Sequence, residues 1–149
     1  MKLNEEENAL ITRLKQVALG YVQQHSYAGH DRTHTIRVHR LSRIIGEKEK
    51  ADLLVLEAAA LLHDIGRSYE HVDHAEKSAE IATGLLKECQ FPEDSTPRVL
   101  YAIRMHRFSK GTEPETLEAK ILQDADRIDI GGATGVAMTF DYGGSKDME

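Results

Sequence analysis

Two adjacent polar residues, His63 and Asp64, end an apolar stretch over residues 53–62. A buried carboxylate without a partner would be costly at such a position. A divalent cation would satisfy both side chains, because imidazole supplies a nitrogen ligand and the carboxylate supplies an oxygen and a negative charge. The alternative is that the two residues cap the end of a helix and face solvent.

Eight histidines in 149 residues also point to metal or acid–base chemistry, since imidazole is the commonest metal ligand and titrates near neutral pH. His34 lies in the first turns of a helix expected over residues 31–49, about thirty residues before the His63-Asp64 pair. Asp126 lies about sixty residues after the pair, on a helix with apolar neighbours. Three helices would therefore have to position the candidate ligands.

Apolar residues recur at helical spacing along the whole chain, and no stretch alternates as a half-buried strand does. A chain of about 150 residues forms one domain, so we expect an all-α, single-domain bundle of six or seven helices over residues 1–149. The expected helices begin after an N-cap at Asn4, span about 31–49 and 53–63, begin at an Asp73/Glu76 capping box, run from an N-cap at Thr96 to His106, and span about 115–128.

Three further expectations concern local packing. The isoleucines and leucine of the second helix, Ile36, Leu41, Ile44 and Ile45, should face inward. Gly66 should form a left-handed C-cap after the buried helix. The glycines at 131, 132 and 135 should break or loosen the next segment, and residues from about 140 to 149 should form a flexible or truncated tail.

The composition disfavours several classes of partner. The net charge of −6, from 19 basic and 25 acidic residues, provides no basic face for long nucleic acid, although small anionic substrates remain compatible with it. No segment approaches the run of about 18 apolar residues that a membrane helix needs, and the first residues are acidic, so we expect a cytoplasmic protein without a membrane span. The single cysteine, Cys89, is expected to be partly buried near a helix end. No exposed heptad seam is evident, which leaves a monomer or a homodimer.

The ordered motifs resemble the HD superfamily of metal-dependent phosphohydrolases, named for its adjacent His and Asp. The resemblance is carried by GHDRTHTIRV (29–38), AALLHDIGR (59–67), DHAEKSAEIA (73–82), AIRMHRFS (102–109), ETLEAKILQDADRID (115–129) and TFDYGGSK (139–146). It is greatest for a subgroup of small uncharacterised bacterial and archaeal HD hydrolases. Such proteins continue for several dozen residues beyond the glycine-rich segment, so we expect either a short or truncated member or one in which the missing helices are dispensable.

This resemblance implies that His34, His63, Asp64 and Asp126 are the metal ligands. Asp124 is the rival for the last position, and both cannot face the metal, because two residues along a helix turn by about 200°. Asp126 matches the family's Ala-Asp-x-hydrophobic string and is the predicted ligand. Asp129 could support the site from the same side of the helix.

Four other residues could act on the substrate. Arg67 lies where the HD-GYP cyclic dinucleotide phosphodiesterases carry a phosphate-binding lysine. Its guanidinium could make a bidentate contact with a phosphate, or it could remain solvated at the helix end. His74 and His106 resemble the histidines of a second metal site. The paired His-His of those relatives is missing, however, so one metal is favoured, and the two histidines are expected to bind substrate phosphate or act as general acids. Arg37 could reach a phosphate, an acidic residue behind the ligands, or a surface partner.

Some of the remaining polar residues have two possible roles, and others are assigned no role. His30 and Asp31 could orient His34 or simply cap its helix. Lys120 could reach the pocket, although a surface position is favoured. His25, His39 and His71 receive no role.

The resemblance implies a hydrolase with one divalent transition metal, which could be Mn, Fe, Co, Ni or Zn. Metal-bound hydroxide would attack a nucleotide or a related small phosphate ester. Asp64 would help to orient or deprotonate the water, while Arg67 and Arg37 would offset charge on the phosphate. Neither a P-loop nor a serine nucleophile elbow is present.

Two other functions remain open. The chain could be a catalytically silent regulatory module that binds a metal or nucleotide without turnover. It could also be a structural helical domain with solvent-facing histidines, which predicts no tight metal and indifference to replacement of His63 and Asp64.

Overall fold

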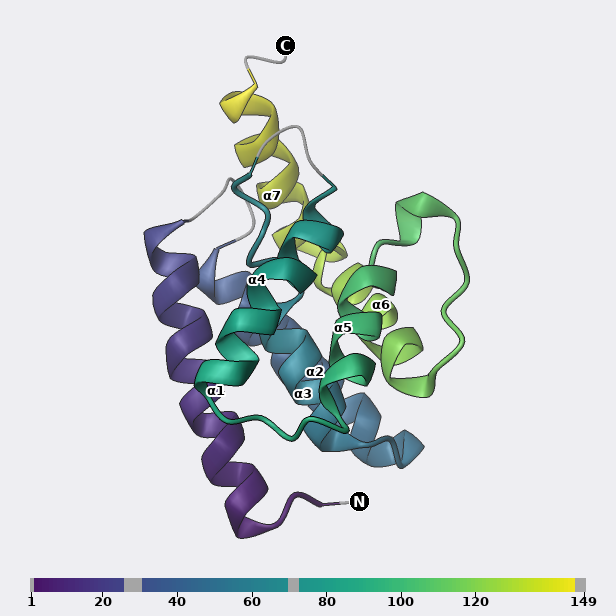
Figure 1. Cartoon of the computed structure of the whole chain (residues 1–149). Helices are drawn as coiled ribbons and strands as arrows, with labels where there is room; N and C mark the ends of the chain where they lie inside the picture. Colours follow the sequence, from purple (N-terminus) through teal and green to yellow (C-terminus); the bar gives the residue numbers. More distant parts are fainter. Residues whose placement is uncertain (1, 26–30, 70–72, 147–149) are drawn as a thin grey trace.

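A computed structural model of the chain describes residues 2–25, 31–69 and 73–146. These residues form seven α helices and no strand (Figure 1), which confirms the all-α prediction. The helices are α1 (Glu5–Gln24), α2 (Arg32–Glu49), α3 (Leu53–Leu62), α4 (His74–Glu88), α5 (Thr96–Met105), α6 (Leu117–Asp129) and α7 (Gly132–Ser145), with a short 3-10 helix η1 (Phe108–Lys110) after α5.

Helix α3 lies at the centre of the bundle. All ten of its residues are buried, as expected for a segment that is apolar almost all the way round. The helices α1, α2, α4, α5 and α6 all pack against it. Because α3 ends inside the domain, the two residues that follow it, His63 and Asp64, are also buried.

Most of the predicted helix starts are confirmed. Asn4 and Glu7 form a capping box in which each side chain accepts a hydrogen bond from the other residue's backbone N–H, at 2.9 and 2.8 Å. Three more helices have an aspartate as the N-cap: Asp31 at α2, Asp52 at α3 and Asp73 at α4.

Two predicted caps are wrong. Ser95 rather than Thr96 is the N-cap of α5, because the Thr96 hydroxyl donates to the carbonyl of Pro92 at 2.9 Å. Glu76 does not complete a capping box with Asp73, since its carboxylate accepts from Arg104 of α5 at 2.9 and 3.1 Å.

The inner face of α2 is more polar than predicted. Ile44 is 51% exposed, and the other three residues predicted to face inward are only half-buried. The buried residues of this helix are His34, Thr35, Val38, His39, Ser42 and Gly46. The prediction failed because both histidines find carboxylate partners on neighbouring helices, which lets polar side chains occupy the face that packs against the core.

Gly66 is not a left-handed cap. It is absent from the residues of positive φ, and a Cβ atom at this position would lie 2.5 Å from the backbone nitrogen of Ser78. Glycine is needed here because α4 passes very close to the turn that follows α3.

The predicted break occurs before α7, where Gly131 is the N-cap and Gly132 has a φ of 66°, but the helix continues through Gly135 to Ser145, into the range predicted as a tail. Gly135 is its one buried residue, and Phe140 is 78% exposed. The helix therefore forms with few tertiary contacts, and it projects from the bundle at the top of Figure 1. Residues 147–149 lie outside the described part of the chain. Across the described ranges, no helix has the length and apolar character needed to cross a bilayer.

Candidate metal centre

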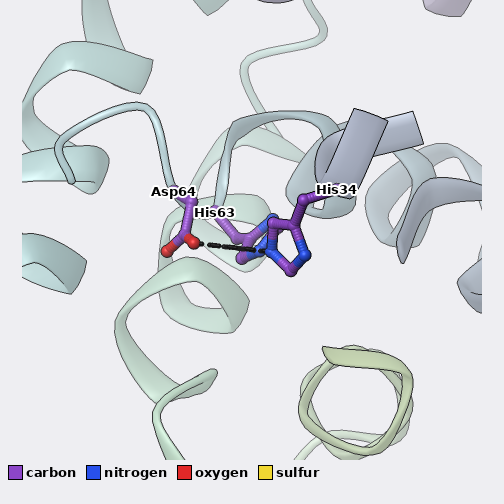
Figure 2. Close-up of side chains that lie close together, drawn as sticks. All are labelled: His34, His63 and Asp64. Carbon is purple, nitrogen blue, oxygen red and sulfur yellow. Dashed lines mark hydrogen bonds and ion pairs between the residues drawn. The ribbon is translucent and has the colours of Figure 1, made fainter. Parts of the chain in front are cut away.

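Four side chains from three regions converge beside the end of α3. The Nε2 atoms of His34 and His63 lie 3.3 Å apart. Asp64 Oδ2 lies 3.5 Å and 3.7 Å from these nitrogens, and Asp126 Oδ1 lies 3.4 Å and 3.7 Å from them. Figure 2 shows the two imidazole rings and the Asp64 carboxylate turned toward one another. The structure thus brings together all four residues predicted as ligands.

The spacing of these four atoms fits a divalent cation. Ligand atoms about 2.1 Å from a tetrahedral metal lie about 3.4 Å from one another. The five separations given above range from 3.3 to 3.7 Å. The donor set of two imidazoles and two carboxylates is also one that divalent transition metals accept.

The hydrogen bonds behind the two rings fix which nitrogen faces the centre. His34 Nδ1 lies 2.8 Å from Asp129 Oδ2, and His63 Nδ1 lies 2.9 Å from the carbonyl oxygen of Ala60. These oxygens only accept, so each Nδ1 donates, and each neutral ring presents an Nε2 lone pair to the centre. Asp126 Oδ1 is buried there and has no hydrogen-bond partner among the described residues. Converging acceptors of this kind call for a cation between them.

The charges around His34 lead to the same conclusion. Burial lowers the pKa of the His34 ring, but hydrogen bonds to Asp129 and Asp64 outweigh it and raise that pKa to about 10. Burial likewise opposes the protonation of His63, and Asp64 and Asp126 raise its pKa. The centre therefore attracts positive charge, and a metal ion would displace protons when it binds.

Arg37 is held behind the centre by Asp129. Its Nε and Nη2 atoms donate to the two carboxylate oxygens of Asp129 at 2.7 and 3.0 Å. Burial raises the pKa of Asp129, but His34 and Arg37 overcome that effect and lower it to about 2. Of the three interpretations of Arg37, the structure favours contact with an acidic residue behind the ligands.

A second cluster faces the other oxygen of Asp64. Asp64 Oδ1 lies 3.5 Å from His74 Nε2 and 3.4 Å from His106 Nε2. The Nδ1 atom of His106 donates to the carbonyl of Ile103 at 2.7 Å, so its Nε2 also presents a lone pair. Asp64, His74 and His106 could hold a cation of their own, and Asp64 belongs to both clusters.

His74 is poorly suited to act as a general acid. Burial lowers its pKa to about 3, and the charges of Arg67 and Arg107 add to this effect against the opposing charge of Asp64. Arg67 Nη1 lies 2.9 Å from both ring nitrogens. The ring is therefore neutral, and the adjacent guanidinium opposes a further positive charge at its nitrogens.

The other candidates lie away from the centre. The Asp124 side chain is 63% exposed and pairs with Arg127 at 3.7 Å, and Lys120 is exposed. Asp31 caps α2 by accepting from the backbone of Thr33 and His34. His30 and His71 fall outside the described residues. Two histidines that received no role from the sequence make contacts within the fold. The ring of His25 stacks on Tyr21, and His39 pairs with Glu57.

A cavity of about 420 Å³ opens beside the second cluster. The sequence predicted five of its lining residues as site residues: Asp64, Arg67, His74, His106 and Asp126. It did not single out the other five, Arg107, Phe108, Ser109, Arg127 and Ile130. Each of these lies within four residues of His106 or Asp126, and proximity to a candidate ligand was the signal that could have identified them.

The HD domain family model matches residues 32–131, a span that contains all four converging side chains. The chain belongs to the HD domain family. The matched span includes helices α2 to α6 and the residues of both clusters.

Relatives of known sequence cover much of the chain. The uncharacterized protein YpgQ of Bacillus subtilis is 39% identical over 123 residues, which are 80% of this chain and 60% of YpgQ. Ribonuclease Y of Desulforudis audaxviator is 33% identical over 103 residues, which are 69% of this chain and 19% of that protein. The chain therefore spans about three fifths of YpgQ and about one fifth of ribonuclease Y.

Two solved structures share the fold. A predicted HD superfamily hydrolase from an uncultured Thermotogales bacterium has a TM-score of 0.73 and 40% identity, covering 88% of this chain and 74% of that one. The structure of B. subtilis YpgQ in complex with ADP has a TM-score of 0.71 and 28% identity over a longer alignment, covering 96% of this chain and 70% of that one.

Proposed function

We propose that this HD domain is a metal-dependent phosphohydrolase that acts on a nucleotide or a related small phosphate ester. The observation that carries the proposal is the convergence of His34, His63, Asp64 and Asp126 with separations of 3.3 to 3.7 Å. Membership of the HD family supports it. A nucleotide is favoured because YpgQ has been solved with ADP.

The cavity supports an anionic substrate. Arg67 and Arg107 line it beside Asp64 and Asp126. Guanidinium groups can hold phosphate oxygens with two parallel hydrogen bonds. A phosphate placed between the arginines and the carboxylates would lie next to both clusters.

Each residue then has a distinct task in the proposed reaction. A bound cation would activate water and polarise the phosphoryl oxygen. Asp64 is placed to orient that water, because its two oxygens face both clusters. Arg67 would neutralise charge that develops on the phosphate, while the contacts of Asp129 and Ala60 hold the rings of His34 and His63 in position.

The second cluster supports a second cation position next to the first. The sequence favoured one metal, with His74 and His106 as phosphate ligands or acids. The lone pair that His106 directs at Asp64 supports cation binding, whereas the Arg67 guanidinium beside His74 opposes it. Against the effect of burial, carboxylates raise the pKa of His34, whereas burial and Arg67 lower that of His74, so the first position attracts positive charge more strongly and should fill at lower metal concentration.

The test is to purify the chain without chelator, measure bound metal by elemental analysis, and assay phosphate release from a panel of nucleotides. Asp64→Ala should lose metal and turnover. Asp94→Ala, at an exposed position before α5, is the matched control and should keep both. Metal with no turnover on any substrate would favour the catalytically silent regulatory module. Absence of metal from the wild type and from the control variant, after addition of Mn, Fe, Co, Ni and Zn, would contradict the metal centre itself.

A further inference from the structure

We propose that Phe108 and Arg127 form a stacking surface for a flat ring of the substrate, so that the site selects nucleoside phosphates over phosphates that lack a base. This inference rests on the proposed function and specifies the part of the substrate farthest from the reacting phosphate. We call these two residues the stacking pair.

The stacking pair consists of two flat groups in contact. The guanidinium carbon of Arg127 lies 3.9 Å from the centre of the Phe108 ring, within the range of a cation–π contact. Arg127 Nη1 also lies 3.7 Å from Asp124 Oδ1, which helps to hold the group in place. Planar bases stack on aromatic rings and on guanidinium planes.

Burial within the fold does not explain Phe108. Its side chain is 56% exposed, yet it lines the 420 Å³ cavity together with Ile130, which is 52% exposed. Two large apolar side chains are therefore exposed in a cavity whose other side is charged. Ligand pockets commonly combine apolar surface with a few placed polar groups, in volumes of about 300 to 1,000 Å³.

The chain connects the stacking pair directly to the candidate ligands. Phe108 follows His106 by two residues, and Arg127 immediately follows Asp126. A base on the stacking pair and a phosphate near the metal centre would thus be held by the same two segments, one after α5 and one on α6. A nucleoside phosphate has this chemistry, with an anionic group at one end and a flat ring at the other.

The experiment compares paired substrates with and without a base, ADP with inorganic pyrophosphate and AMP with ribose 5-phosphate, in the metal-loaded protein. Phe108→Ala should lower kcat/KM for the nucleotide by roughly 10-fold or more, mainly through KM, since a base–aromatic stack contributes about that much. The same variant should change kcat/KM for the base-free partner by less than about 2-fold. Phe108→Tyr should restore the nucleotide preference, and Phe140→Ala, an exposed phenylalanine on α7, is the matched control.

The outcomes separate this inference from the proposed function. Hydrolysis with equal use of nucleotide and base-free phosphate would overturn the stacking pair and leave the hydrolase intact. If nothing is hydrolysed, equilibrium dialysis with ADP decides. Weaker binding by Phe108→Ala than by Phe140→Ala would support the stacking pair in a catalytically silent protein. Equal binding by the two variants, or no ADP binding by the wild type, would overturn it.

Discussion

Helix α2 carries two buried histidines with similar surroundings and different geometry. His34 binds Asp129 of α6 at 2.8 Å, and His39 binds Glu57 of α3, also at 2.8 Å. The two histidines differ in what surrounds the second nitrogen of the ring. His34 directs Nε2 at three other candidate ligands, whereas Nδ1 of His39 has no hydrogen-bond partner among the described residues.

The comparison shows that burial and a carboxylate partner do not by themselves identify a functional histidine. His39 and Glu57 join α2 to α3, and Arg43 adds an ion pair to Glu57 at 3.7 Å. His34 and Asp129 make a similar join between α2 and α6, but that bond leaves Nε2 directed at the candidate metal centre. We therefore expect changes at His34 to remove function and changes at His39 to reduce stability.

The largest difference should appear when each histidine is replaced by glutamine. His34→Gln removes an imidazole from the candidate ligands at the end of α3, so metal binding and turnover should fall to background. His39→Gln keeps a side chain that can still bond to Glu57, so both properties should remain near those of the wild type. Elemental analysis and initial rates measure this contrast, and equal losses in the two variants would remove the distinction.

The free energy of unfolding should be sensitive to changes at His39, where metal binding is not. His39→Leu leaves the buried Glu57 carboxylate without its hydrogen bond and should lower the free energy of unfolding by on the order of 3 kcal/mol. The double variant His39→Leu/Glu57→Leu should recover much of that loss, because both polar groups are then gone. Urea unfolding of the single and double variants provides the measurement. A double variant that is less stable by the sum of the two single effects would argue against a coupled pair.

Removal of the metal should destabilise the wild type. A ligand present at 100 times its Kd stabilises the folded state by about 2.7 kcal/mol, so a chelator should remove about that much from the wild type and from His39→Gln. His34→Gln should not respond. Thermal unfolding with and without chelator tests this, and a chelator effect of equal size in His34→Gln would locate the metal elsewhere.

The smallest expected effect concerns the carboxylates behind the rings. Asp129→Asn weakens the charged partner that orients His34, and such changes typically reduce metal affinity by about 10- to 100-fold. Glu57→Gln is the matched change behind His39 and should leave metal affinity unchanged. A metal-buffered titration of the two variants gives both constants, and unchanged affinity in Asp129→Asn would mean that Asp129 does not support the centre.

The sequence predicted features that depend on near neighbours. The buried character of α3 and the caps at Asn4 and Asp73 follow from periodicity and from side chains close in sequence. The convergence of His34 and Asp126, which are 92 residues apart, was available only through the order of motifs in a family.

The features that the sequence did not reveal depend on partners far along the chain. Glu57 lies within an apolar run, and nothing local indicates that His39 of another helix will meet it. Phe108 looks like an ordinary surface or core residue until Arg127 is placed over its ring. Packing between helices, which no local pattern encodes, decides both cases.

Gly66 determines how closely α4 can approach the turn that carries Asp64. Its N–H donates to Ser78 Oγ at 2.9 Å, and an added methyl group would meet the backbone of α4. Because the close contact is with backbone, no change of side-chain rotamer could relieve it. A methyl group here would push against α4, the helix that begins with His74, and we expect it to lengthen the 3.5 Å separation of His74 Nε2 and Asp64 Oδ1. The absence of a side chain at this one position therefore lets His74 reach Asp64, although the atoms closest to an added Cβ belong to neither cluster's donors.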